Sequence, residues 1–271
     1  TPLGAGELAV LASLGHARVA VRCRPRVAVL ATGAELLPVD APSPLAPGRI
    51  RDSNSAMLAS LVAEAGGEAE QLQAVSDRLE DVLPVVRQAL DSGEYDMLLT
   101  SGGVSVGDHD VMVDLFDTWG GRLLFNKVQM RPGSPTTAGC RNDRLLIALS
   151  GNPGACLVGF RLLVRPALQS LLGEPRATAA QLSLSSTHPG PPAPLQLYEE
   201  AILDGAPIKG IALERYVRAK LRLNGGRVYA MPCAGNKSSD LLSLREAECL
   251  IVVPPGGEGV QPGAVVRIIR L

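Results

Sequence analysis

The residues with the clearest chemical potential lie in one glycine-rich run, residues 101–108 (SGGVSVGD), which is closely followed by Asp110. Its glycines allow positive φ and a close approach of a ligand to the backbone. Its serines add hydroxyl donors, and Asp108 and Asp110 could hold a Mg²⁺ that bridges phosphates. In front of a helix, such a loop favours an anion, although its composition is equally typical of a simple glycine-rich turn.

Two further loops carry polar residues next to expected strand ends. Residues 149–154 (LSGNPG) could form a second oxyanion cradle or a tight connection in which Asn152 caps the next helix. Spacing alone favours the cap. Glu35, in residues 32–36 (TGAEL), lies just past a strand end, where a lone glutamate is usually only solvated.

A fourth segment, residues 127–135 (KVQMRPGSP), places two cations four residues apart, Lys127 and Arg131. Such a pair can clamp phosphate or a similar oxyanion, yet it is more often a pair of surface charges. No Ser-His-Asp or Cys-His arrangement is readable in the sequence. The loops therefore favour anion binding over nucleophilic catalysis.

Alternating strand and helix patterns surround these loops. Apolar runs predict strands at 26–32, 71–75, 95–100 and 145–149, and periodic apolar residues predict helices at 57–66, 79–90, from about 109, and 155–172. This order is typical of an α/β domain with a doubly wound, mostly parallel sheet and right-handed crossovers. Its ligand crevice is expected at the carboxyl ends of the strands, where the glycine-rich run lies.

The last third of the chain has a different composition. Residues 173–195 are rich in proline, as in a linker, and short strands are predicted at 216–223, 228–231, 250–253 and 265–271. Gly225-Gly226 is a hairpin signal between the first two of them. We predict a lead-in at 1–25, an α/β domain at 26–172, a linker at 173–195, and a small C-terminal β-barrel or β-sandwich at 196–271.

Composition limits the class of protein. The chain has 271 residues, of which 46% are apolar, and a formal net charge of −1, so it is globular and lacks the basic surplus expected for nucleic-acid or membrane partners. Its five cysteines are scattered without a C-x-x-C pair, which argues against a disulfide framework or zinc site and favours a cytoplasmic location. No apolar run spans a bilayer and no signal-like segment opens the chain. Thr1 is not a natural start, so a fragment is expected.

Five segments in the first two thirds of the chain form an ordered set of motifs: ATGAEL from Ala31, GRIRDSN from Gly48, TSGGVSVGDHD from Thr100, KVQMRPGSP from Lys127 and LSGNP from Leu149. Taken in order, they resemble the molybdopterin molybdenumtransferase family, which includes the bacterial MoeA proteins and the gephyrin E domain. The resemblance is strong over residues 5–172 and weaker in the C-terminal β-domain, where it rests on SSDLLSL from Ser238 and on the VVPPGGEG run.

The resemblance implies a molybdopterin-binding α/β domain followed by a β-barrel, without the family's two N-terminal domains, in a homodimer with a shared cleft. It also implies Mg²⁺-dependent insertion of molybdate into adenylylated molybdopterin, with release of AMP. By position, the catalytic residues are Glu35, Asp77, Asp110 and Lys127, and the metal ligands are Asp108 and Asp110. The implied binding residues are Thr100, Ser101, Gly102, Gly103, Ser105, Gly107, Arg131, Gly151, Asn152 and Pro153.

Several positions depart from the family pattern, and most of these changes remove a cation or a carboxylate. The departures are Ala34, Arg51, Arg78, Val113, Ser134 and Ser150. Two alternatives therefore stay open. One is a molybdopterin adenylyltransferase, whose relatives share the TSGG loop but usually lack the β-domain, and the other is a non-catalytic molybdopterin-binding scaffold.

Overall fold

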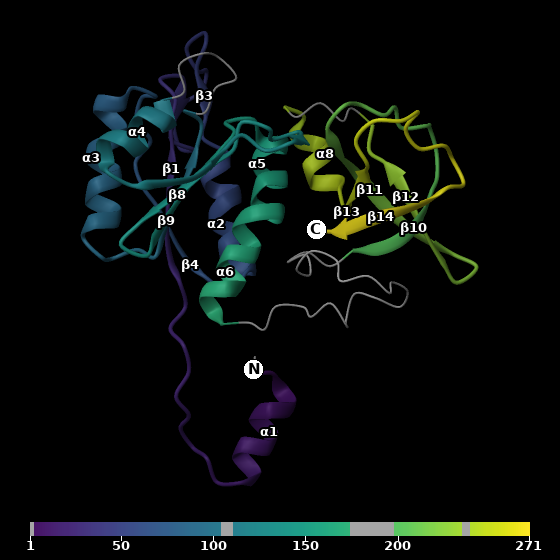
Figure 1. Cartoon of the computed structure of the whole chain (residues 1–271), viewed down its shortest axis with the longest axis horizontal. Coiled ribbons are helices and arrows are strands. Elements are labelled where there is room, and N and C mark those ends of the chain that lie inside the picture. Colours follow the sequence, from purple (N-terminus) through teal and green to yellow (C-terminus); the bar gives the residue numbers. More distant parts are fainter. Residues whose placement is uncertain (1–2, 104–110, 174–197, 235–238) are drawn as a thin grey trace.

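Two six-stranded sheets organise the chain in the computed structural model (Figure 1). The structure describes residues 3–103, 111–173, 198–234 and 239–271. The first sheet has the strand order β4-β1-β5-β9-β8-β6, and the second has the order β12-β10-β14-β13-β11-β7. A short two-stranded pairing joins β2 (Leu36–Leu37) to β3 (Ile50–Arg51).

The first sheet is mixed, with its parallel part at the centre. The parallel strands are β4 (Glu68–Gln71), β1 (Arg26–Ala31), β5 (Met97–Ser101) and β9 (Arg144–Leu149). Two antiparallel strands follow, β8 (Thr137–Arg141) and β6 (Arg122–Asn126). The prediction that the third apolar run lies inside the sheet is confirmed, because β5 is flanked by β1 and β9 and all five of its residues are buried.

Helices cover both faces of this sheet, as expected for a doubly wound domain. On one face lie α2 (Asn54–Glu64), α5 (Pro153–Gly159), a π-helical turn (Phe160–Val164) and α6 (Arg165–Leu172), and on the other lie α3 (Leu79–Asp91) and α4 (Val111–Trp119). Successive residues of a strand face opposite sides. Accordingly, Val27 and Val29 pack against the first group of helices, and Ala28 and Leu30 against the second.

The helical stretch at residues 153–172 is, by length and composition only, apolar enough to cross a membrane, and half of it is buried. Its side chains Phe160, Val164 and Leu168 are fully buried against the sheet. Core packing within the α/β domain accounts for its apolar composition.

The second sheet closes into a β-barrel. Its strands are β10 (Glu199–Leu203), β11 (Glu214–Asn224), β12 (Arg227–Pro232), β13 (Cys249–Val253) and β14 (Val265–Arg270), with α8 (Leu241–Glu246) before β13. The barrel closes because β12 pairs with both β10 and β11. The predicted hairpin is confirmed, since Asn224 pairs with Arg227 and both glycines between them have positive φ, 57° and 74°.

The two units are joined by a strand and an apolar cluster. The short strand β7 (Met130–Arg131) belongs to the α/β part of the chain but pairs with the start of β11 in the barrel sheet. Met130 and Val158 pack with Tyr216, Leu250 and other barrel residues in one buried cluster. The segment that carries Lys127 and Arg131 is therefore anchored on the barrel.

The structure differs from the prediction mainly at sheet edges. The strand expected at 71–75 is β4, which ends at Gln71 and has four exposed residues, so it has no apolar pattern to place it. The edge strand β6 was missed for the same reason, and β8, β10, α8 and α1 (Ala5–Ser13) were also not predicted. Residues 174–197 are outside the described residues, so the domain boundaries stay a prediction.

The apolar cluster between the two units makes a prediction about stability. Met130 is 2% exposed in this cluster, whereas Met231, on the barrel strand β12, is 37% exposed. We expect Met130→Ala to lower the free energy of unfolding by about 2–5 kcal/mol, because it leaves a cavity where the units meet. The matched control, Met231→Ala, should cost under about 1 kcal/mol. Urea unfolding measures both free energies. Equal unfolding midpoints for the two variants would show that the buried cluster stabilises the protein no more than an exposed methionine does.

Candidate functional site

Three loops meet at the carboxyl ends of the parallel strands. They follow β1 at Thr32, β5 at Ser101 and β9 at Leu149. The backbone N–H of Thr32 donates to the carbonyl of Ser101 at 2.9 Å, and that of Gly102 donates to the carbonyl of Leu149 at 3.0 Å. Direct main-chain contact thus fixes the relative positions of the three loops.

The glycine at position 102 is required by the packing of these loops. Gly102 has φ +101°, and a Cβ there would lie 2.2 Å from the carbonyl oxygen of Thr32. Gly151 also lies close to Gly102, since an added Cβ at position 151 would lie 3.3 Å from the Cα of Gly102. The sequence analysis interpreted Gly102 as a position where a ligand can approach the backbone. That interpretation was incomplete, because the backbone of Thr32 in the adjacent loop also occupies the space beside Gly102.

Asn54 joins two of the loops and was not identified from the sequence as a site residue. It is the first residue of α2 and is 8% exposed. Its Nδ2 atom donates to Ser101 Oγ at 2.7 Å and to the carbonyl of Gly151 at 2.8 Å. Since a carbonyl can only accept, this bond fixes the orientation of the amide. Asp52, which precedes the N-cap residue Ser53, accepts a hydrogen bond through Oδ1 from the N–H of Ser55 at 3.0 Å.

Five buried side-chain atoms around these loops have no hydrogen-bond partner among the described residues. A buried polar atom without a partner is costly, so a cluster of them indicates a group that binds there. The five atoms are Thr32 Oγ1, Asn54 Oδ1, Ser55 Oγ, Thr100 Oγ1 and Asn152 Oδ1. They supply hydroxyl groups and amide oxygens toward the carboxyl end of the sheet.

Cys156, in α5, forms a hydrogen bond with Ser101. Burial raises the pKa of the Cys156 thiol to about 12, and a hydrogen bond with Ser101 offsets part of this rise. The thiol is therefore neutral at physiological pH and packs as a small apolar group. Its contribution to the site is a buried hydrogen bond with Ser101.

The second loop differs from the prediction. Asn152 occupies the N-cap position of α5, but its side chain makes no capping hydrogen bond, so the predicted cap is wrong. Pro153 follows at the first helical position, where it has no N–H that needs a partner. The Asn152 Oδ1 atom is instead buried without a partner, which fits the alternative of a second cradle.

The predicted outer carboxylates lie at the β1 end of the site. The Glu35 side chain is exposed and folds back over Gly33, where an added Cβ would lie 2.7 Å from either carboxylate oxygen. Asp77 is exposed two residues beyond Val75, which forms a parallel bridge with Thr32. Both carboxylates therefore follow segments that end at the same edge of the sheet.

The predicted cations lie on the loop that returns from β6 to β8. Lys127 is exposed in the left-handed region with φ 66°, and its N–H donates to the carbonyl of Thr136 at 3.0 Å. Arg131 is exposed on β7. Gly133 brings this loop to the start of α5, since its Cβ would lie 3.2 Å from the carbonyl oxygen of Ala155. The cation loop and the loop after β9 are thus neighbours.

The remaining predicted residues, Ser105, Gly107, Asp108 and Asp110, lie outside the described residues. The proposed metal ligands therefore stay a prediction. Within the described ranges, no group of three or more His, Cys, Asp or Glu side chains is arranged to hold a metal ion.

Two of the departures from the family pattern have visible roles. Arg51 fixes the loop that precedes it by donating two hydrogen bonds. Its Nε donates to the carbonyl of Val39 at 3.0 Å, and its Nη2 donates to the carbonyl of Ala41 at 2.6 Å. Arg78 pairs with Glu80 at 3.3 Å on the exposed first turn of α3. Nothing in the structure explains Val113 or Ser134 in terms of a site.

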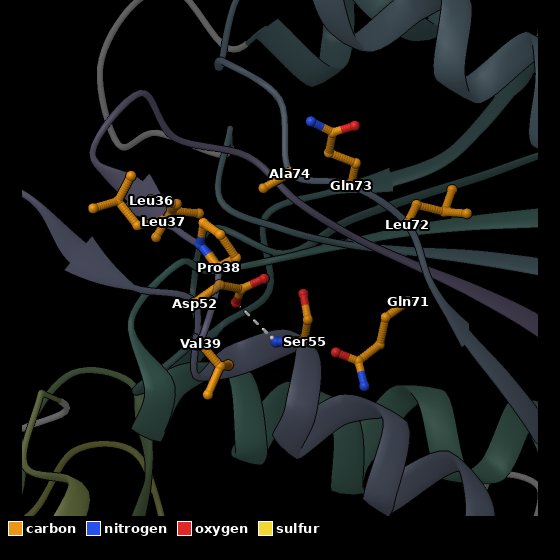
Figure 2. Close-up of a pocket in the computed structure, with 10 residues that line it drawn as sticks. All are labelled: Leu36, Leu37, Pro38, Val39, Asp52, Ser55, Gln71, Leu72, Gln73 and Ala74. Atoms are coloured by element: carbon orange, nitrogen blue, oxygen red, sulfur yellow. Dashed lines mark hydrogen bonds between the residues drawn. The ribbon is translucent and has the colours of Figure 1, made fainter. Parts of the chain in front are cut away.

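A cavity of about 310 Å³ adjoins the meeting point of the loops (Figure 2). It lies between residues 36–39 and residues 71–74, with Asp52 and Ser55 at the start of α2 between them. Fold and site together define a doubly wound α/β domain with an attached β-barrel, whose candidate ligand site lies at the carboxyl ends of the parallel strands.

Comparison with known families identifies this class more closely. Residues 28–170 match a family model described as a probable molybdopterin binding domain, and residues 201–271 match one described as the MoeA C-terminal region (domain IV). The chain belongs to the MoeA family of molybdopterin-binding proteins, and the family resemblance read from its sequence is confirmed.

Similar proteins cover the chain almost completely. It is 39% identical over 268 residues to the molybdopterin molybdenumtransferase of Bacillus subtilis (strain 168), which covers 98% of this chain. It is 35% identical to the protein of the same name from Staphylococcus epidermidis, again over 98% of the chain. A crystal structure of a molybdopterin biosynthesis MoeA protein from Pyrococcus horikosii has a TM-score of 0.77 at 25% identity and covers 99% of the chain.

The chain spans 57%, 59% and 60% of the length of these three relatives. The activity of the whole protein is therefore a matter for a proposal.

The close packing around Gly102 can be tested against a glycine in open space. Gly102→Ala should be about 1–3 kcal/mol more destabilising than Gly120→Ala. Both positions have positive φ, but only at position 102 would the added Cβ clash with the backbone of another loop. Thermal unfolding of the two variants measures the difference. Equal melting temperatures would contradict the inferred contact with Thr32.

Proposed function

We propose that this protein inserts molybdate into adenylylated molybdopterin in a Mg²⁺-dependent reaction that cleaves the adenylate and releases AMP. The observation that carries the proposal is a group of four buried polar atoms where the loops meet that have no partner among the described residues: Thr32 Oγ1, Asn54 Oδ1, Thr100 Oγ1 and Asn152 Oδ1. Membership in the MoeA family and the names of the relatives support the same reaction.

In this proposal, different site residues bind different parts of the substrate. The turn of Ser101, Gly102 and Gly103 would face the phosphate part of the substrate. The Gly102 N–H already donates to the carbonyl of Leu149, so the Gly103 N–H and the Ser101 hydroxyl are the donors of this turn that would favour an anion. The other binding residues are Thr100, Ser105, Gly107, Gly151, Asn152 and Pro153.

Charged residues around this turn have separate tasks in the proposal. Asp108 and Asp110 offer the carboxylate oxygens that Mg²⁺ prefers, and a bound Mg²⁺ supplies positive charge against the phosphoanhydride. Lys127 and Arg131 attract molybdate, and Glu35 and Asp77 are the outer carboxylates. In the hydrolysis, a water oxygen would bond to one phosphorus of the anhydride and the P–O bond to the other phosphate would break. AMP and the pterin phosphate would leave, the protons of the water would go to solvent, and no covalent enzyme intermediate would form.

The two alternatives are less well supported. An adenylyltransferase would use the same α/β domain, but the match of residues 201–271 to domain IV favours the insertase. A non-catalytic scaffold would be compatible with Arg78 and Ser134, which replace family carboxylate and cation positions.

Turnover in the purified protein separates these functions. With adenylylated molybdopterin, Mg²⁺ and molybdate, we expect release of AMP and inserted molybdenum. New adenylate would support the adenylyltransferase, and tight binding without turnover would support the scaffold.

Asp110→Asn should abolish Mg²⁺-dependent AMP release with little change in melting temperature, because asparagine still suits a helix start but carries no charge. Asp117→Asn on the exposed side of α4 is the matched control and should turn over normally. Normal Mg²⁺ dependence in Asp110→Asn would remove the metal assignment.

We also propose a cytoplasmic homodimer with a cleft shared between protomers. The family resemblance supports the dimer, and a net charge of −1 gives no strong electrostatic barrier to association. Static light scattering at micromolar concentration should give twice the monomer mass, and a monomer mass would contradict the dimer.

A further inference from the structure

The cavity of about 310 Å³ in Figure 2 shares the first turn of α2 with the meeting point of the loops. Asn54 binds the loops, and the next residue, Ser55, lines the cavity. The cavity volume is at the small end of the range of roughly 300–1,000 Å³ that is usual for small-molecule sites. One side of this helix turn thus contacts the phosphate-binding region and the other side a separate pocket.

The two walls of the pocket are apolar except for Gln71 and Gln73, which lie on either side of Leu72 (Figure 2). On one side lie residues 36–39 (Leu-Leu-Pro-Val), and on the other lies Leu72, just after β4 (Figure 2). The first wall is fixed in place, because the N–H of Asp52 donates to the carbonyl of Leu37 at 2.8 Å and Arg51 binds the carbonyl of Val39 at 3.0 Å. The pocket is therefore formed before a ligand enters.

Two polar groups lie at the start of α2, between these walls. Asp52 accepts from the Ser55 N–H through Oδ1, which leaves its other carboxylate oxygen for a ligand (Figure 2). Ser55 is only 3% exposed, and its hydroxyl has no partner among the described residues. A hydroxyl can donate and accept, whereas a carboxylate only accepts. The ligand must therefore bring at least one N–H or O–H donor and at least one further polar atom.

The carboxylate of Asp52 disfavours an anion. A phosphate or molybdate group beside it would face its negative charge, whereas a ring N–H or amino group would form a charge-assisted hydrogen bond with it. Apolar residues on both walls, with Asp52, Ser55 and two glutamines as polar partners, suit a nitrogen heterocycle that carries an amino group. Adenylylated molybdopterin has two such rings, the pterin and the adenine.

We propose that this pocket binds an amino-bearing nitrogen heterocycle of the substrate, stacked between the apolar walls with its N–H edge on Asp52 and its neighbouring polar atom on Ser55. This inference rests on the proposed function for the identity of the ring, and it adds a specificity site to the phosphate-binding turn. The first turn of α2 then sets the distance between the ring and the phosphates of one substrate molecule.

Binding of single rings tests the proposal without turnover. The probes are AMP and neopterin, each titrated alone into the protein by calorimetry, with pterin fluorescence as a second readout for neopterin. We expect one of the two to bind, and that probe identifies the ring. Asp52→Asn should weaken its binding at least about tenfold, because a charge-assisted bond becomes a neutral one. Ser55→Ala should weaken it by about three- to tenfold.

The variants are chosen so that the fold survives. Asparagine caps helices as well as aspartate does, and the Ser55 hydroxyl has no partner to lose. Asp40→Asn is the matched control, since it removes the same charge from the exposed loop beside the pocket and should bind the probe as the unmodified protein does. Unchanged melting temperatures establish that each variant is folded.

Two results would overturn the proposal: neither probe binds the unmodified protein at about 10 mM, or Asp52→Asn and Ser55→Ala both bind the probe as tightly as Asp40→Asn does. The insertion assay is scored separately. Insertion with ring binding that ignores Asp52 would refute the pocket alone, and ring binding through Asp52 without insertion would refute the proposed function alone.

Discussion

The contact between the three loops at the carboxyl ends of β1, β5 and β9 is the constraint on which the site depends. The Nδ2 atom of Asn54 holds two of these loops together through Ser101 Oγ and the carbonyl of Gly151, at 2.7 Å and 2.8 Å. Main-chain packing around Gly102 leaves no room for a side chain. Once these bonds are made, hydroxyl and amide oxygens remain that have no partner among the described residues, and we assign them to a ligand in the proposed function.

The surroundings of this contact divide the chemistry by charge. The loops after β1 and β5 offer the hydroxyl groups of Thr32 and Thr100, which can donate to an anion, and the cation loop approaches the start of α5 at Gly133. The pocket on the other side of the α2 start has a carboxylate, which disfavours anions. A substrate with phosphates in the middle and amino-bearing rings at its ends would be aligned by this separation, and alignment of this kind is a large part of catalysis. The barrel contributes by holding β7 through Met130.

Much of the fold could be predicted because its central strands are buried on both faces. The apolar runs that became β1, β5 and β9 were each placed within about two residues, and the hairpin at Gly225 and Gly226 followed from two adjacent glycines. Strands at the sheet edges could not be predicted, because β4 and β6 expose most of their residues and so carry no alternating pattern.

The site was predictable only in part, for a different reason. The glycine-rich run indicates where a ligand lies, but the bonds of Asn54 reach partners 47 and 97 residues away along the chain. No local pattern separates a buried asparagine that joins two loops from one that caps a helix. Asn152 shows the same ambiguity, since its position predicts a cap while its side-chain oxygen lies buried without a partner.

The most direct test of the site is the chemical shift of its backbone amides during titration with adenylylated molybdopterin. If the substrate phosphates bind where the loops meet, the largest changes occur at the N–H signals of Gly102, Gly103 and Gly151. The amides of the barrel hairpin at Gly225 and Gly226 serve as an internal reference and should not move. Saturable shifts confined to the barrel or to α1, with Gly102, Gly103 and Gly151 unchanged, would contradict the assignment of this site.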